Sequence, residues 1–173
     1  MENLSDASLN CFIKRLGGSL RHLHIRGVML TDKSLQNLGN LTKLEKLTVY
    51  SAYGWPRGIR AIARFSNLKE LSVSGAVELQ GKDLVRAFCN RRLEKLVWLE
   101  LSCCYKLTDA ALMAVAKSCP NIKTLDLEGS GQFTDTSLVF VVNTCKFLTA
   151  INLSRVSRCF FNGAQATFCK LKR

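Results

Sequence analysis

The sequence predicts an α/β fold in which one unit, a short strand followed by a helix, is stacked repeatedly along the chain. The first observation behind this prediction is an apolar triplet, L-x-x-L-x-L, that occurs six times in the 173 residues. The second is that Thr108-Asp109 and Cys119 return as Thr134-Asp135 and Cys145, 26 residues later in both cases. A unit that recurs at a fixed interval indicates a repeat architecture.

The spacing of the triplets identifies the repeat class. Their first residues lie 24, 24, 28, 26 and 26 residues apart, which is within the 20–29-residue period of leucine-rich repeats. One such unit cannot bury its apolar face alone, whereas stacked units share a continuous core. We therefore expect a leucine-rich-repeat solenoid, a right-handed horseshoe segment with a parallel sheet on its concave side and helices on its convex side. The triplets are Leu20-Leu23-Ile25, Leu44-Leu47-Val49, Leu68-Leu71-Val73, Leu96-Leu99-Leu101, Ile122-Leu125-Leu127 and Leu148-Ile151-Leu153.

The domain organisation follows from the same repeat. We expect a single leucine-rich-repeat domain over residues 1–173, with about six repeats and helices at 32–38, 83–88, 109–116 and 135–142. Asp32, Asp109 and Asp135, or the threonine before each, are suited to cap these helices. Residues 4–9 (LSDASL) match the middle of a repeat, so the chain starts mid-repeat and we expect it to be part of a longer protein. Residues 54–58 (GWPRG) replace Thr-Asp in the second repeat and place Trp55 in a position that the pattern leaves open.

Composition and charge exclude several classes of protein. The chain is 47% hydrophobic and 22% charged, which is typical of a globular domain. The longest apolar run, residues 110–116, is far shorter than the roughly 20 residues of a membrane span. The net charge of +12 is concentrated in residues 1–95 and 154–173. A basic balance favours anionic partners without naming them, and nucleic acid is disfavoured because aromatic residues do not interleave with the basic ones.

Eight cysteines occur, and no pair has the C-x-x-C spacing of a zinc site. No export signal accompanies them, so we expect reduced and mostly buried thiols that pack between repeats rather than disulfides. Cys119 and Cys145 are predicted to end consecutive helices, one above the other. The eight cysteines are Cys11, Cys89, Cys103, Cys104, Cys119, Cys145, Cys159 and Cys169.

Residues 119–145 carry a longer motif, C-P-x-I-x-x-L-x-L followed by T-D-x-x-L and a closing cysteine. This motif resembles the cysteine-containing repeat of the F-box/leucine-rich-repeat protein family, most closely over residues 96–153. The resemblance implies substrate-receptor repeats of a Skp–cullin–F-box ubiquitin ligase that act in ubiquitin-dependent protein degradation, in the cytoplasm or nucleus. The F-box itself is absent here, so the ligase linker subunit is expected as a partner only of a longer form. A stand-alone repeat scaffold and an anion-binding module stay as alternatives.

The predicted function is the recognition of a protein substrate on the concave face. Since the leucines of each strand point inward, the alternate residues face outward, with neighbours about 4.8 Å apart. Trp98 stands among acidic residues there and is suited to anchor a partner, because tryptophan is enriched at interface hot spots; the alternative is that it only fills space. The predicted binding residues are His22, His24, Arg26, Lys46, Tyr50, Glu70, Trp98, Glu100, Asp126, Glu128 and Asn152.

No enzymatic activity is expected. The only histidines, His22 and His24, lie on one predicted strand, and no catalytic triad can be drawn from that strand alone. Two imidazoles are also too few for a firm metal site. The sequence therefore predicts a protein without catalytic residues, cofactor or metal.

Overall fold

The computed structural model describes residues 5–26, 36–50 and 58–156. Asp32 and most of the helix predicted at 32–38 lie outside these residues. Trp55, Cys159 and Cys169 also lie outside them.

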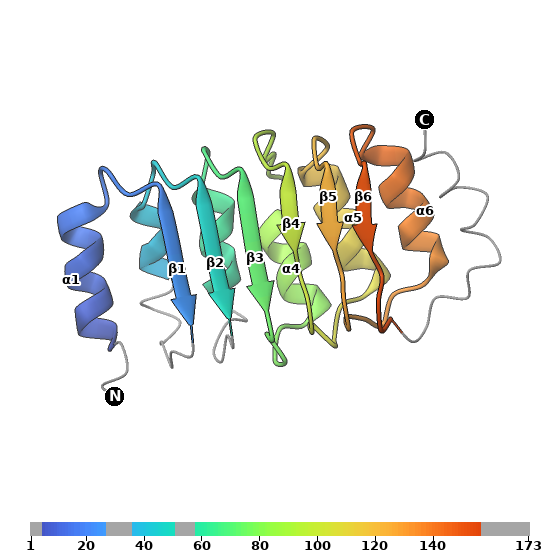
Figure 1. Cartoon of the computed structure of the whole chain (residues 1–173), viewed down its shortest axis with the longest axis horizontal. Coiled ribbons are helices and arrows are strands. Elements are labelled where there is room, and N and C mark those ends of the chain that lie inside the picture. Colours follow the sequence, from blue (N-terminus) through green and yellow to red (C-terminus); the bar gives the residue numbers. More distant parts are fainter. Residues whose placement is uncertain (1–4, 27–35, 51–57, 157–173) are drawn as a thin grey trace.

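The core of the fold is one sheet of six parallel strands that lie side by side in chain order (Figure 1). Each strand pairs with the next in an unshifted register, so that the equivalent residues of successive repeats face each other. This α/β arrangement is compatible with leucine-rich repeats. The strands are β1 (His22–Arg26), β2 (Lys46–Tyr50), β3 (Glu70–Ser74), β4 (Trp98–Glu100), β5 (Thr124–Asp126) and β6 (Ala150–Asn152).

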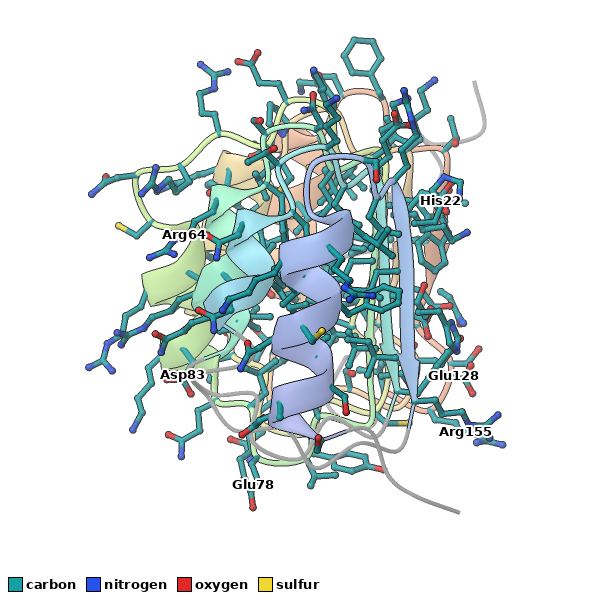
Figure 2. The ribbon with its side chains drawn as sticks, turned by 90° about the vertical axis from the view of Figure 1, so that its left-hand side faces the viewer. His22, Arg64, Glu78, Asp83, Glu128 and Arg155 are labelled. Atoms are coloured by element: carbon teal, nitrogen blue, oxygen red, sulfur yellow. The ribbon has the colours of Figure 1, made fainter. Side chains whose placement is uncertain are left out.

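The described helices lie on one side of this sheet and leave its other face open (Figures 1 and 2). Three predicted helices are present but each is two residues longer than expected. The first begins at 81 instead of 83, and the other two end at 118 and 144, directly before a cysteine. The α-helices are α1 (Asp6–Leu16), α4 (Gly81–Phe88), α5 (Asp109–Ser118) and α6 (Asp135–Thr144), and two 3₁₀ helices, η1 (Leu38–Asn40) and η2 (Ile59–Arg64), stand between α1 and α4.

The leucine triplets form the core between sheet and helices. Leu47, Leu71 and Leu99, at the centres of β2, β3 and β4, are at most 1% exposed. At the two ends of the sheet, Leu23 and Ile151 are only partly buried, because each has a neighbouring strand on one side alone among the described residues. The burial of the triplets therefore depends on stacking.

The Thr-Asp pair has a more specific role than a helix cap. Thr108 and Thr134 occupy the cap positions with extended backbones, but neither hydroxyl bonds to its own helix. Instead, the carboxylate of Asp109 accepts hydrogen bonds from the Thr134 backbone N–H, at 2.7 Å, and from the Thr134 hydroxyl, at 3.0 Å. The pair thus joins the start of one helix to the start of the next.

The cysteines confirm one prediction and correct another. Cys119 and Cys145 end α5 and α6, are buried, and are stacked so that the Cys145 thiol lies 3.7 Å from the Cys119 carbonyl oxygen. All six described cysteines are free in the structure, and Cys11 and Cys89 are exposed. Cys11 lies on the outer side of α1, which no described repeat covers, and Cys89 lies where the chain leaves α4. The expectation that the thiols are mostly buried is therefore wrong for these two residues.

Candidate functional site

The open face of the sheet carries three rows of side chains, which we call the outer rows. The register aligns the first row over all six strands as His22, Lys46, Glu70, Trp98, Thr124 and Ala150. The second row is His24, Thr48, Ser72, Glu100, Asp126 and Asn152.

The third row begins on the strands as Arg26, Tyr50 and Ser74. Beyond the shorter strands β4 to β6 it continues through backbone hydrogen bonds. The carbonyl oxygens of Ser102, Glu128 and Ser154 accept the N–H groups of Gly75, Cys103 and Gly129, at 2.8–3.0 Å.

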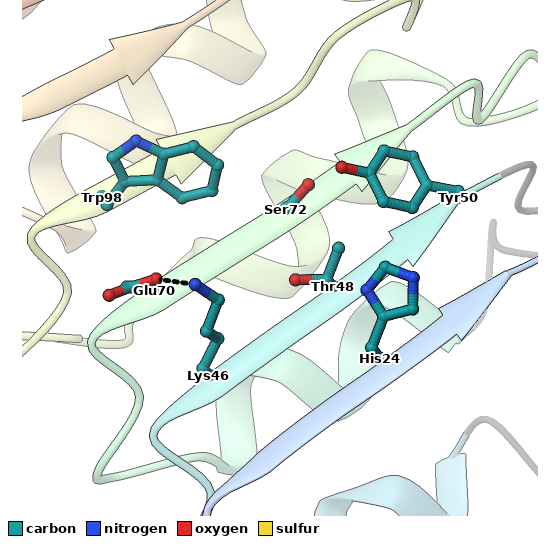
Figure 3. Close-up of a pocket in the computed structure, with 7 residues that line it drawn as sticks. All are labelled: His24, Lys46, Thr48, Tyr50, Glu70, Ser72 and Trp98. Atoms are coloured by element: carbon teal, nitrogen blue, oxygen red, sulfur yellow. Dashed lines mark ion pairs between the residues drawn. The ribbon is translucent and has the colours of Figure 1, made fainter.

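A hollow of about 550 Å³ lies on this face over β1 to β4, and we call it the open-face pocket (Figure 3). Its floor is made by Thr48 and Ser72, which are 7% and 1% exposed although they belong to an outer row. Both are small, and the larger side chains around them stand higher and shield them. The walls are His24, Lys46, Tyr50, Glu70 and Trp98.

The walls of the open-face pocket combine rings with a neutralised charge pair. Lys46 Nζ lies 2.6 Å from Glu70 Oε2, and the rings of His24 and Tyr50 lie 5.4 Å apart in a tilted arrangement. An exposed ion pair of this kind contributes only about 0–1 kcal/mol to stability. The pair can therefore rearrange toward a partner, and the partly buried Trp98 offers a large rigid surface beside it.

The acidic residues beyond the pocket are already bound to protein groups. Glu100 Oε2 accepts a hydrogen bond from the Ser72 hydroxyl at 2.8 Å. Asp126 accepts the backbone N–H of Glu128 at 2.9 Å and the side-chain amide of Asn152 at 3.0 Å. These contacts fix the carboxylates in place.

Asp126 and Asn152 share a local structure that the sequence analysis did not predict. Each side-chain oxygen accepts the backbone N–H two residues later, at Glu128 and Ser154, and so forms a turn at the end of its strand. An Asp or Asn as the last residue of a strand is the signal that could have found it. Both residues therefore help to build the fold as well as its surface.

The structure thus divides the predicted binding residues into three groups. His24, Lys46, Tyr50, Glu70 and Trp98 meet in the open-face pocket. Glu100, Asp126, Glu128 and Asn152 form a second, hydrogen-bonded group over β4 to β6. His22 and Arg26 are exposed at opposite ends of β1 and do not line the pocket.

Two floor residues, Thr48 and Ser72, were missed by the sequence analysis. They carry no charge or ring and attracted no attention on their own. Their signal is the contrast between a small residue in the middle row and larger residues beside it, as at Thr48 between Lys46 and Tyr50.

Among residues 5–26, 36–50 and 58–156, no group of three or more His, Cys, Asp or Glu side chains is placed to hold a metal ion. Within the same residues, the helices are all too short or too polar to cross a membrane.

Comparison with known proteins finds a similarity that bears on the class of protein. Over 99 residues the chain is 25% identical to F-box/LRR-repeat protein 4 of Bos taurus. The match covers 57% of this chain and 16% of that protein. It suggests a leucine-rich-repeat type of family, and no family model matches the chain.

Proposed function

We propose that the chain is a leucine-rich-repeat solenoid segment that recognises a protein partner on the open face of its sheet and catalyses no reaction. The observation that carries this proposal is the open-face pocket, where the register brings rings, a charge pair and small floor residues together. Protein interfaces favour such pockets, in which an anchor side chain is surrounded by groups that can exclude water.

The electrostatics of the open face favour a partner with both apolar and basic groups. The pocket itself is nearly neutral because Lys46 and Glu70 are paired. The neighbouring surface carries Glu100, Asp126 and Glu128, and the only cation that pairs with them among the described residues is Arg155, 3.7 Å from Glu128. An apolar side chain in the pocket and a basic segment over β4 to β6 would match both regions.

We further propose that these repeats are the substrate-receptor part of a Skp–cullin–F-box ubiquitin ligase, in the cytoplasm or nucleus. The support for this proposal is the name of the similar protein, F-box/LRR-repeat protein 4, of which the match spans 16%. The linker subunit of the ligase would bind only a longer form that carries an F-box. A stand-alone repeat scaffold is the alternative, and mapping the transcript upstream of Met1 separates the two.

A site-specific crosslinking experiment tests the binding face. A photoreactive amino acid, p-benzoylphenylalanine, is placed at Lys46 in the wall of the pocket and, as a control, at the exposed Asn143 of α6. We expect a crosslinked protein partner from position 46 and none of the same mass from position 143. Crosslinks that form only from position 143 would place recognition on the helix side and contradict the proposal.

A further inference from the structure

A second hollow lies on the helix side of the molecule, away from the open face. It measures about 450 Å³ and is lined by four arginines, Arg60, Arg64, Arg86 and Arg91, and we call it the arginine pocket. The first two come from η2, the third from the last turn of α4, and the fourth from the turn that follows α4. Figure 2 shows Arg64 on this side of the molecule.

Two local features bring these arginines together. Asn90 has a φ of 61° and reverses the chain at the end of α4, so that Arg91 lines the same pocket as Arg86. The stem of Arg64 lies across Gly39, where a side chain would come within 2.6 Å of Arg64 Cδ. The absence of a side chain at position 39 therefore lets Arg64 pass over η1.

The charge of the arginine pocket is not neutralised by any described carboxylate. Among the described residues, no ion pair joins any of its four arginines to a carboxylate. The nearest acidic residue of α4, Asp83, is buried in the cap of its own helix, where it accepts the Gln80 N–H at 3.3 Å. A cation in the last turn of α4 interacts favourably with the helix dipole. This interaction accounts for the position of Arg86 but not for the other three arginines. Four arginines around one hollow, none of them paired with a described carboxylate, repel each other and attract anions.

A third hollow, of about 840 Å³, adjoins the arginine pocket and shares Cys89, Asn90 and Arg91 with it. It lies between α4 and α5, and its lining adds the apolar side chains Val85, Phe88 and Met113. Because the two hollows share these residues, we treat them as one groove. The arginine pocket is one end of it, and the other end combines the apolar side chains with the cations Arg92 and Lys117.

We propose that this groove binds a phosphorylated segment of a protein partner, with the phosphate in the arginine pocket and a neighbouring apolar side chain between α4 and α5. A phosphate carries a charge of about −1.5 to −2 and three acceptor oxygens, so it can engage more than one guanidinium at once. Guanidinium groups also bind phosphate through two parallel hydrogen bonds. A single carboxylate would leave most of the four arginines unpaired.

The side chains between α4 and α5 favour a protein segment over a nucleic acid. A nucleic-acid groove combines an extended track of cations with aromatic side chains on which bases stack. Here Phe88 is the only aromatic residue of the lining, and at 1% exposed it offers no face on which a base could stack. An aliphatic side chain fits such a surface better than a base does.

The test uses the whole 173-residue chain and a peptide, Ala-Ala-Leu-pSer-Leu-Ala-Ala, titrated while the arginine side-chain signals are followed by NMR. The controls are the same peptide with unmodified serine, a 12-nucleotide oligothymidylate, and phosphatidylcholine vesicles that contain phosphatidylserine. We expect the phosphopeptide to shift the side-chain signals of the pocket arginines and to bind about tenfold or more tightly than its unmodified form.

Two double variants separate the pocket from general charge. Arg64→Gln with Arg86→Gln should weaken phosphopeptide binding about tenfold or more, because charge-assisted hydrogen bonds to phosphate are lost. Lys43→Gln with Lys146→Gln removes the same charge from exposed positions outside both hollows and should change binding little. Arg60→Gln with Arg91→Gln tests the same pocket if the first variant melts differently from the native chain.

Equal losses in the arginine and lysine variants would overturn the proposal, since they would show attraction by net charge alone. Tighter binding of the oligothymidylate or of the vesicles through the same arginines would assign the groove to another class of partner and would also overturn it. So would the absence of any phosphate-dependent shift.

Discussion

Asp109 shows how a single side chain encodes the stacking of repeats. Partial burial of its carboxylate raises its pKa, but hydrogen bonds from Ser137 and Thr134 outweigh this effect and lower the pKa of Asp109 overall. Asp135 is its equivalent in the next helix, and its buried Oδ1 has no hydrogen-bond partner among the described residues. Asp109 therefore links two repeats, whereas Asp135 begins the last described helix, beyond which no further helix is described.

Replacing Asp109 by alanine should lower the free energy of unfolding by about 1–2 kcal/mol, because the Thr134 N–H and hydroxyl lose a charged acceptor. Folding lowers the pKa of Asp109. The stabilisation is therefore fully present at pH values above the unfolded pKa of about 3.9, and it is lost as the pH falls through the folded pKa. Urea unfolding at pH 7 and at pH 2–3 measures both effects. An unchanged midpoint at pH 7 would show that the link contributes nothing.

The cysteines differ from one another through their burial. Burial raises the pKa of Cys104 to about 12 and that of Cys145 to about 11, and it also raises the pKa of Cys119. Only the thiolate is a nucleophile. At pH 8 an aromatic disulfide reagent should therefore label Cys11 and Cys89 rapidly and reach the three buried thiols only after unfolding.

Peptide mapping by mass spectrometry identifies the labelled thiols. Rapid labelling of the three buried cysteines in the native chain would contradict the described packing. Disulfides in freshly purified protein would contradict the expectation of a reducing compartment.

At the scale of elements, the starts of the helices are matched to one another. Gly81 begins α4 at the position where Asp109 and Asp135 begin the next two helices. The side chain of Thr108 occupies the space that a side chain at position 81 would need. Thr108 is β-branched and has little freedom to move aside.

Gly81→Ala should destabilise the fold by about 1–3 kcal/mol, because the crowding against Thr108 exceeds the roughly 1 kcal/mol that alanine adds as a helix former. Gly18→Ala is the matched control, since nothing lies within 4 Å of a side chain added there. Thermal unfolding of both variants, and of Gly81→Ala combined with Thr108→Ala, measures the effect. The combination should recover most of the loss; equal melting of the two single variants would contradict the predicted crowding.

At the scale of the whole molecule, the described part of the stack ends at α1 in an exposed apolar face. On α1, Phe12 and Leu16 are 44% and 36% exposed and line a hollow of about 700 Å³ together with Cys11. In a stacked architecture such a face is normally covered by a cap or a further repeat. No described residue covers it.

We therefore expect the isolated chain to self-associate through α1. Phe12→Lys combined with Leu16→Lys should shift the chain toward a monomer in analytical ultracentrifugation, because the charges oppose burial of this face. The native chain sedimenting as a monomer at all concentrations would show that α1 is an effective cap.

Much of the fold could be predicted because its signals are periodic. The triplets fixed the positions of all six strands, and the Thr-Asp pairs fixed the starts of α5 and α6. The exposure of Cys89 could not be predicted, because it depends on the backbone reversal at Asn90 rather than on the repeat pattern.

The candidate site was only partly predictable. Strand alternation predicts which residues face outward, so the outer rows follow directly from the triplets. Their division into a pocket and a hydrogen-bonded group does not follow, because it depends on side-chain size and pairing across strands, as at Ser72 and Glu100. The arginine pocket joins residues of η2 and α4 that are about one repeat apart, and their convergence is a property of the stack.

The central claim, that the open face binds a protein, is tested most directly by the affinity of the crosslinked partner for variants of that face. Calorimetry should show that Trp98→Ala weakens binding by about 2 kcal/mol or more, roughly thirtyfold, as expected for a buried anchor. Glu100→Lys should slow association with a basic segment most at low salt, and Asn143→Ala on α6 should change nothing. An affinity that is unaffected by Trp98→Ala and Glu100→Lys together, in a variant that melts like the native chain, would contradict the claim.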